Sequence, residues 1–392
     1  MIIRKVYQEL TNSLKVKQII AITGLRRVGK TTAVKYLLSQ IDISNKIYLD
    51  LERIEYRKIF SGENYSDIVS ALEFEGIDFQ QKAVIALDEI QLVTNVTSVI
   101  KYIYDTYDVK FIITGSSSFY MRGAFSESLA GRKRLFELWP LSFSEFLQFK
   151  DEVIKLPKFN FEQTNSRFIS KHQLHYDEYV NYGGFPEVVL SNSHDNKTAL
   201  LKDIFDSYIN LDIKFLADLK KVDELYSLIK LLSARVGSKV DFSKIAGITG
   251  INRHKVKDYL LFLENTFFIK LVKPYVTNPD REIALQNKVY FTDSGLLNIL
   301  GNINIGNLFE NSVCNQLKLL GKVQYYARRT GQEIDFILDG TTAIEVKTTP
   351  TAYDLKLLVN RANSIGLENY TLVGKNTPGS EFRSFTWGGA IY

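Results

Sequence analysis

GLRRVGKT, residues 24–31, matches the phosphate-binding pattern G-x-x-x-x-G-K-[ST]. The apolar run QIIAIT at residues 18–23 comes directly before it and predicts a buried strand. Residues 32–38, which follow, have the spacing of a helix. The order of strand, glycine-rich loop and helix is the context that this pattern requires, so a chance glycine-rich turn is the weaker interpretation.

The residues of this loop have distinct expected roles in holding a nucleotide. The glycines let backbone N–H groups curl around the β- and γ-phosphates, and the helix that follows adds its positive N-terminal end. Lys30 is expected to reach the phosphate oxygens, and the Thr31 hydroxyl to ligate Mg²⁺. The residues predicted to contact the nucleotide here are Gly24, Arg27, Val28, Gly29, Lys30, Thr31 and Thr32.

A second segment, AVIALDE at residues 83–89, predicts an apolar strand that ends in two acids. Such a strand is buried in a parallel sheet, and its carboxyl end opens on the edge where α/β sheets bind ligands. Asp88 is expected to hold Mg²⁺ through water, and Glu89 to orient or deprotonate the attacking water. The alternative is that both acids simply end a strand and face solvent.

Three further apolar runs predict strands at residues 46–51, 110–114 and 135–139, and helical patterns separate them. This alternation indicates a parallel, doubly wound sheet with right-handed crossovers. Thr114 or Ser116, at the end of the fourth strand, is a candidate for sensing the γ-phosphate, although a serine-rich turn is also ordinary loop chemistry.

The segment LAGRKR at residues 129–134 precedes the fifth strand and carries a candidate catalytic arginine. Phosphoryl transfer often needs a cation at the γ-phosphate, sometimes from a neighbouring subunit. Arg132 is the first candidate and Arg134 the second. An arginine at a sheet edge is otherwise a solvated charge.

Composition places bounds on the protein class. A chain of 392 residues, 45% hydrophobic and 24% charged, is expected to form two to four soluble domains. A single cysteine, Cys314, argues against a disulfide framework and fits a reducing cytosol. No signal peptide or apolar run long enough for a membrane is expected, so the predicted location is cytoplasmic. The net charge of +5 permits an anionic partner.

Taken together, the segments above resemble the core of the AAA+ superfamily. The resemblance is to the bacterial and archaeal clade whose members carry a C-terminal domain of unknown function. It extends to YGGFPE at residues 182–187, which is similar to the Gly-x-Pro signature of that clade's helical lid. The resemblance implies ATP with Mg²⁺ as the ligand and places Gly184 and Pro186 near the adenine. From the residues alone, this stretch indicates a helix stop or a turn.

Residues 242–263 have the layout of a helix-turn-helix, with a turn at Gly250 and a wing strand expected at residues 267–272. In the second helix the residues predicted to face the core are Val256, Tyr259, Leu260 and Leu263. Those predicted to face solvent are Asn252, Arg253, His254, Lys255 and Lys257. A basic exposed helix suits DNA. The alternative is a packing module whose solvated basic face meets a protein partner.

The C-terminal segment carries a second possible chemistry. An acid lies in the strand IDFIL at residues 334–338, and the next strand, AIEVK at residues 343–347, places its acid and its lysine on one face. Asp335 and Glu345 would hold Mg²⁺, Lys347 would position water, and Glu310 from a helix would complete the shell. This pattern resembles the PD-(D/E)xK nuclease superfamily. Surface ion pairs of these acids with Arg328, Arg329 and Lys347 are the alternative.

The sequence therefore predicts an α/β protein with four parts. They are a P-loop AAA+ core at 1–145, a helical lid and connector at 146–220, a winged helix-turn-helix at 221–278 and a restriction-endonuclease-like domain at 279–392. The expected function is Mg-dependent ATP hydrolysis directed at DNA, with a possible homo-oligomer. The alternative is a nucleotide-controlled switch or scaffold that binds a protein partner through an inactive C-terminal domain.

Overall fold

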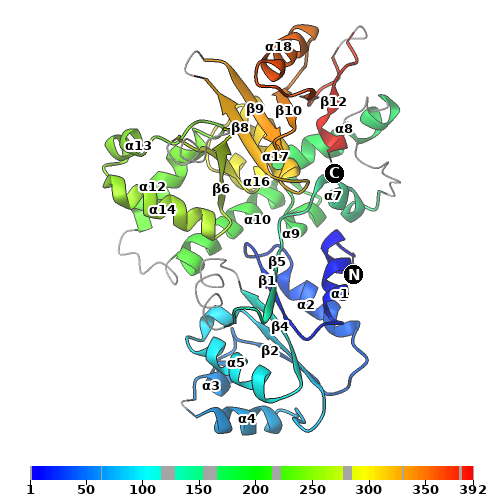
Figure 1. Ribbon diagram of the computed structural model, residues 1–392, viewed down its shortest axis with the longest axis vertical. Coiled ribbons are helices and arrows are strands. Elements are labelled where there is room, and N and C mark those ends of the chain that lie inside the picture. The colour runs from blue at the N-terminus through cyan, green and yellow to red at the C-terminus, as the bar shows by residue number, and fades with distance from the viewer. Residues whose placement is uncertain are drawn as a thin grey trace. The chain divides into compact units, whose positions relative to one another are not determined.

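The computed structural model describes residues 2–62, 64–115, 129–152, 166–213, 222–276, 285–328, 331–378 and 382–391. The chain divides into two compact units (Figure 1). The first consists of Met1–Trp139 with the short segments Asn210–Asp218 and Asn265–Phe267. The second consists of Pro140–Ile209, Leu219–Glu264 and Phe268–Tyr392. The predicted boundaries at 145, 220 and 278 stay predictions.

The first unit is built on a five-stranded sheet with the order β2-β3-β4-β1-β5. All four neighbouring pairs are parallel, which confirms the predicted parallel sheet. The strands are β1 (Ile19–Thr23), β2 (Lys46–Asp50), β3 (Ala83–Asp88), β4 (Val109–Gly115) and β5 (Lys133–Glu137). The central strands β1, β3 and β4 are buried along their whole length, because apolar residues occupy both faces.

Helices cover both faces of this sheet. Alternate residues of the strands, such as Ile85 and Phe111, form one apolar cluster with residues of α3, α4 and α5. α2 also packs on β4, through a face whose buried Val34 and Leu37 lie outside that cluster. The helices are α1 (Lys5–Ser13), α2 (Lys30–Ser39), α3 (Ile54–Phe60), α4 (Tyr65–Phe74), the 3₁₀ turn η1 (Ile90–Leu92) and α5 (Val96–Thr106).

Strand register brings three chain segments to one edge of the sheet. Thr23, the last residue of β1, pairs with Gly115 at the end of β4. Leu87, next to Asp88 in β3, pairs with Ile113 in β4. The loop after β1, the acids after β3 and Thr114 therefore share the carboxyl edge, where parallel sheets bind ligands.

Helices make up most of the first half of the second unit. They are α7 (Phe143–Phe149), α8 (Ser166–Tyr182), α9 (Pro186–Leu190), α10 (His194–Ser207), the π-helix η2 (Tyr208–Ile213), whose residues from Asn210 onward belong to the first unit, α12 (Val222–Ser233), α13 (Phe242–Thr249) and α14 (Arg253–Asn265). Later come α16 (Ser294–Ile299), α17 (Ile305–Leu317), α18 (Ala352–Asn363) and the turn η3 (Gly388–Ala390). Within the described residues, none of the protein's helices has the length and apolar character needed to cross a bilayer.

A seven-stranded mixed sheet forms the rest of the second unit, with the order β12-β11-β10-β9-β8-β6-β7. Its strands are β6 (Ile269–Pro274), β7 (Lys288–Phe291), β8 (Val323–Ala327), β9 (Glu333–Leu338), β10 (Thr342–Lys347), β11 (Asn369–Gly374) and β12 (Thr386–Trp387). α18 packs on β9, β10 and β11, while α17 packs on β10 and β7. The two strands predicted to carry acids, β9 and β10, are antiparallel neighbours in this sheet.

The helices of the predicted helix-turn-helix form as α13 and α14, separated by Gly250 in a left-handed conformation. The four core positions predicted for the second helix are all buried. The Lys255 side chain, predicted to face solvent, is 39% exposed, and its Nζ also lies 2.6 Å from Glu224 Oε2 of α12. A strand, β6, forms where the wing was predicted, but it pairs with β7 on one side and β8 on the other as part of the seven-stranded sheet, so the winged helix stays a prediction.

Candidate active site

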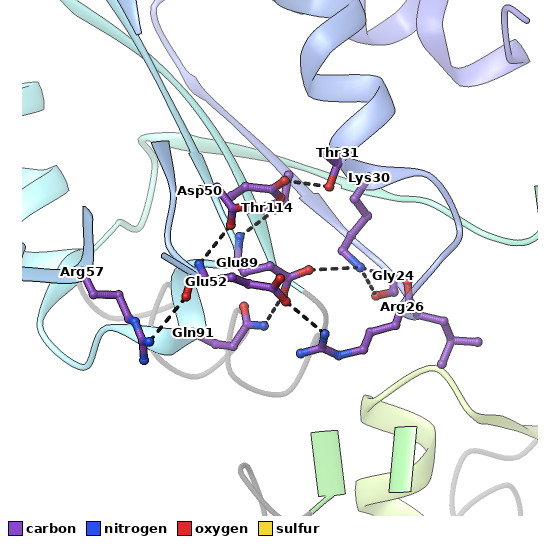
Figure 2. Close-up of polar contacts among 12 residues, drawn as sticks. Gly24, Arg26, Lys30, Thr31, Asp50, Glu52, Arg57, Glu89, Gln91 and Thr114 are labelled. Carbon is purple, nitrogen blue, oxygen red and sulfur yellow. Dashed lines mark hydrogen bonds and ion pairs between the residues drawn. The ribbon is translucent and has the colours of Figure 1, made fainter. Parts of the chain in front are cut away.

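The loop from Gly24 to Gly29 connects β1 to α2, as the sequence predicts (Figure 2). Gly24 has φ +150°, and a Cβ atom there would lie 2.1 Å from the Leu138 carbonyl oxygen. A side chain at this position would therefore collide with the backbone that follows β5. The loop ends at Gly29, which caps α2 with φ +98°.

Lys30 is the first residue of α2, and its side chain is only 4% exposed. Its Nζ donates to the carbonyl oxygens of Gly24 at 3.2 Å and Leu25 at 2.9 Å. The same Nζ lies 3.9 Å from Glu89 Oε1, across the mouth of the loop (Figure 2). The ammonium group is thus held inside the loop, on the side facing Glu89, which follows β3.

Asp88 is 2% exposed and accepts hydrogen bonds from three hydroxyl groups. Thr31 Oγ1 donates to its Oδ2 at 2.6 Å, Tyr48 donates to the same oxygen at 2.7 Å, and Thr114 donates to Oδ1. Burial, together with the hydrogen bond to Asp88, raises the pKa of Tyr48. Carboxylate and hydroxyl oxygens are the ligands that Mg²⁺ prefers, so the adjacent Thr31 and Asp88 fit that ion.

Glu89 has an unusual backbone conformation for a residue other than glycine, with φ +56° and ψ +49°. Such strain is maintained only where the surroundings fix it, and it concentrates at functional sites. Here the Glu89 N–H donates to Thr114 Oγ1 at 3.0 Å, and Gln91 Nε2 donates to Glu89 Oε2. Thr114 therefore holds the backbone of Glu89, and Gln91 orients its carboxylate. Ser116, the other candidate sensor, lies outside the described residues.

Three residues that support this site were not predicted from the sequence. Arg4 is buried and donates to the carbonyl oxygens of Val28 at 3.1 Å and Trp139 at 2.9 Å, so the N-terminal segment supports the loop. Tyr48 in β2 orients Asp88, and Gln91 in η1 orients Glu89. Only the position of Gln91, two residues after Glu89, offered a local signal.

The remaining loop residues differ in their surroundings. Arg27 has φ +61°, Val28 is fully buried, and Thr32 is exposed on α2. Their contacts with a nucleotide stay predictions.

Arg132 lies at the amino edge of the sheet, opposite the loop. It precedes β5, whose Lys133 pairs with Ile19 at the start of β1 and whose Glu137 pairs with Thr23 at its end. Five strand residues span roughly 16 Å, which exceeds the reach of an arginine side chain. Arg132 Nε instead lies 2.8 Å from Asp105 Oδ1, and Arg134 pairs with Glu9. The catalytic role of Arg132 stays a prediction, and from this position it would require a second copy of the chain.

Gly184 and Pro186 belong to the second unit, and their predicted contact with adenine stays a prediction. Gly184 has a packing role of its own, since a Cβ atom there would lie 2.4 Å from the Leu141 carbonyl oxygen. Its N–H donates to Asp293 Oδ2 at 2.8 Å, and its carbonyl accepts the Leu141 N–H at 2.7 Å. Burial raises the pKa of Asp293 to about 6. Pro186 is the first residue of α9.

Gly184→Ala is expected to lower the free energy of unfolding by about 3 kcal/mol, because the new methyl group forces the Leu141 backbone away. Gly247→Ala is the matched control: Gly247 lies in α13, and nothing lies within 4 Å of a Cβ atom placed there. That change should be neutral or slightly stabilising. Urea unfolding midpoints of both variants measure the difference, and equal midpoints would contradict the packing role.

The C-terminal acids lie on β9, β10 and α17, and their predicted role as metal ligands stays a prediction. Asp335 Oδ2 accepts the Val346 N–H at 2.8 Å, and Lys347 Nζ lies 2.9 Å from Glu345 Oε1. Burial and the charge of Asp335 raise the pKa values of both Glu310 and Glu345. The three carboxyl groups therefore interact electrostatically in a region of low solvent access.

Basic side chains also enter this region, and two of them were not predicted: Lys288, and Arg361, whose Nη1 lies 3.3 Å from Glu345 Oε1. Lys288 of β7 is buried and forms an ion pair with Glu333; burial alone would lower its pKa, but the charges of Glu310 and Asp335 raise it. Glu345 Oε2 is buried without a hydrogen-bond partner among the described residues, which would suit a cation. In the described part of the chain, however, no three His, Cys, Asp or Glu side chains are grouped to hold a metal.

Comparison with known proteins gives two domain matches. Residues 16–147 match the sequence profile of the AAA domain, and residues 173–307 match a domain of unknown function. Similar solved structures include a Walker-type ATPase of Pyrococcus abyssi, with a TM-score of 0.47 and 15% identity over 76% of this chain and 96% of that chain. The Aeropyrum pernix ORC1 protein in complex with DNA has a TM-score of 0.31 and 13% identity, over 76% of this chain and 90% of that chain.

The parallel sheet, the phosphate-binding loop with its facing acids and the AAA match define a P-loop ATPase domain of the AAA+ class. An uncharacterized protein of Haemophilus influenzae is 30% identical over 351 residues, 86% of this chain and 84% of that protein. The chain belongs to the same family as that protein. An uncharacterized protein of Methanocaldococcus jannaschii is 26% identical over 381 residues, 93% of this chain and 82% of the relative.

Proposed function

We propose that the protein binds ATP with Mg²⁺ and hydrolyses it to ADP and phosphate at the loop between β1 and α2. The observation that carries this proposal is the 2.6 Å contact between Thr31 Oγ1 and Asp88 Oδ2, with Lys30 Nζ beside Glu89. A hydroxyl and a lysine from the start of α2 and two acids from the end of β3 thus meet at the carboxyl edge of the sheet.

Each residue has a defined task in this reaction. Thr31 and Asp88 would hold Mg²⁺, which neutralises phosphate charge when bound. Lys30 leaves the loop carbonyls to bind phosphate oxygens. Glu89 accepts a proton from water as the water oxygen bonds to the γ-phosphorus and the bond to the β–γ bridging oxygen breaks. Thr114 and Gln91 hold Glu89 in the orientation that this transfer needs.

Phosphate release from ATP by the purified full-length chain tests this proposal. Turnover should require added Mg²⁺, stop on addition of EDTA and resume when Mg²⁺ is restored in excess. ATP that stays intact in Mg²⁺ across a range of protein concentrations would contradict it. The concentration series also tests Arg132, since a contribution from a second copy makes the specific activity rise with protein concentration.

We further propose that the ATPase acts on DNA through α14 and the C-terminal sheet. Arg253, His254 and Lys257 are exposed on α14 and suit DNA phosphates. Asp335, Glu345 and Lys347 are the residue types that a metal-dependent phosphodiesterase uses. The alternative is a nucleotide-controlled switch or scaffold with an inactive C-terminal domain, and the ion pair between Lys255 and Glu224 agrees with a packing role for part of α14.

DNA cleavage separates these two functions. We expect labelled single- or double-stranded DNA to be cut in Mg²⁺ or Mn²⁺, and cutting to be lost in both Asp335→Ala and Glu345→Ala. Glu368→Ala is a suitable control, because Glu368 is an exposed acid in the loop before β11. Absence of cutting with and without ATP would favour the switch. Steeply salt-dependent DNA binding would support the DNA-directed role, whereas nucleotide-controlled assembly without DNA affinity would contradict it.

A further inference from the structure

Arg26 lies inside the phosphate-binding loop, two residues after Gly24, and belongs to none of the roles assigned above. Its side chain is 17% exposed, and its Nη1 lies 3.3 Å from Glu52 Oε1. Figure 2 shows its guanidinium turned toward the side of the loop where Glu89 and Gln91 lie. A positive charge that belongs to the loop itself therefore faces the side on which Glu89, the proposed base, lies.

The backbone of Glu52, which pairs with Arg26, is held in place by two neighbouring side chains. Its N–H donates to Asp50 Oδ1 at 2.9 Å, and its carbonyl accepts Arg57 Nη2 at 3.4 Å. Its side chain, however, is 55% exposed. An ion pair this open to water contributes about 1 kcal/mol or less. Replacing the Glu52 contact by a contact with a more highly charged group therefore costs little.

The terminal phosphate of ATP would supply such a group. Lys30 approaches the phosphate from the loop interior. Thr31 and Asp88 would hold Mg²⁺ on the α2 side. On the remaining side, Glu89 and Glu52 add negative charge. Arg132 lies at the opposite sheet edge, paired with Asp105. Of the two arginines drawn in Figure 2, Arg57 lies beyond Glu52, and Arg26 lies between Glu52 and the loop.

We propose that Arg26 is a catalytic residue that supplies a guanidinium to the γ-phosphate of ATP bound in its own chain, exchanging its contact with Glu52 for phosphate oxygens. This proposal rests on the proposed ATP hydrolysis. Two parallel N–H donors of a planar guanidinium match two phosphate oxygens, a geometry that an ammonium lacks. The charge stabilises the oxygens as the bond to the bridging oxygen breaks and ADP departs with the electron pair.

Arg26→Ala is expected to lower kcat for ATP by about 100-fold or more, because one charged donor to the transition state is lost. ADP affinity should stay within about twofold of wild type, since ADP lacks the group that Arg26 binds. Formation of the complex with ADP, Mg²⁺ and aluminium fluoride, which imitates the transferring phosphoryl group, should be lost as well. Arg26→Lys should recover only part of kcat.

Two control variants make the result specific. Arg53→Ala removes an exposed arginine that pairs with Glu55, and it should leave turnover unchanged. Glu52→Gln should keep or increase kcat, because it releases Arg26. A loss of kcat in Glu52→Gln equal to that in Arg26→Ala would assign the effect to the ion pair and overturn the proposal.

The outcomes separate the proposed role of Arg26 from the proposed ATP hydrolysis. A wild-type chain without ATP turnover would contradict the proposed function itself. A wild-type chain that hydrolyses ATP while Arg26→Ala retains full kcat would overturn only the role of Arg26. Equal losses of ADP and ATP binding in Arg26→Ala would show that the side chain merely shapes the loop. A kcat defect that disappears when wild type is mixed with the variant would indicate action between chains and also overturn the proposal.

Discussion

Lys30→Ala is expected to reduce kcat/KM for ATP by about 1,000-fold. The substitution removes the ammonium that would bind the phosphate oxygens. It also leaves the carbonyl oxygens of Gly24 and Leu25, which now accept from Lys30 Nζ, without that donor. Both effects weaken the site, because the loop loses its positive charge and an internal support.

Phosphate release measured over a range of ATP concentrations checks this prediction. Lys101→Ala provides the matched control, because Lys101 is exposed on α5. Lys30→Met, which keeps most of the buried stem, should be as inactive as Lys30→Ala if the charge is what matters. Near-normal turnover in either variant at position 30 would refute the assignment of the site.

Glu89→Gln is expected to bind ATP but to hydrolyse it about 100- to 10,000-fold more slowly, the range that a general base usually contributes. Glutamine has almost the same shape, so its amide oxygen can still accept from Gln91 Nε2, and the strained backbone remains held by Thr114. What is lost is the carboxylate that accepts the proton. The variant should therefore trap ATP.

Gel filtration with radiolabelled ATP, followed by identification of the retained nucleotide, distinguishes trapping from weak binding. Glu55→Gln serves as the control, because Glu55 is exposed on α3 and pairs with Arg53. A variant that loses ATP binding and turnover to the same extent would show that Glu89 supports the fold of the loop rather than the chemistry.

The sequence is sufficient to predict the first unit's sheet because its determinants are local. QIIAIT and AVIALDE are apolar enough to be buried as strands, and the glycine pattern between strand and helix permits few alternatives. The meeting of Thr31 with Asp88 then follows from parallel register, which brings the ends of strands to one edge.

Other parts of the site depend on contacts that no local pattern records. Arg4 supports the loop from the N-terminal segment, and Tyr48 reaches Asp88 from β2. The position of Arg132 at the amino edge depends on the register of β5 against β1. In the second unit, Lys288 reaches Glu333 because β7 joins the same sheet as β9, although many residues separate them in the chain.

The position of β6 between β7 and β8 has a practical consequence for anyone dividing this protein into fragments. A fragment that stops at residue 278 would contain α13, α14 and β6 but would lack both neighbours of that strand. Both edges of β6 would then present unpaired backbone groups next to apolar residues such as Ile269 and Val272, which invites aggregation. Expression of the helix-turn-helix segment for DNA-binding studies therefore needs the chain to continue at least through β8, at Ala327.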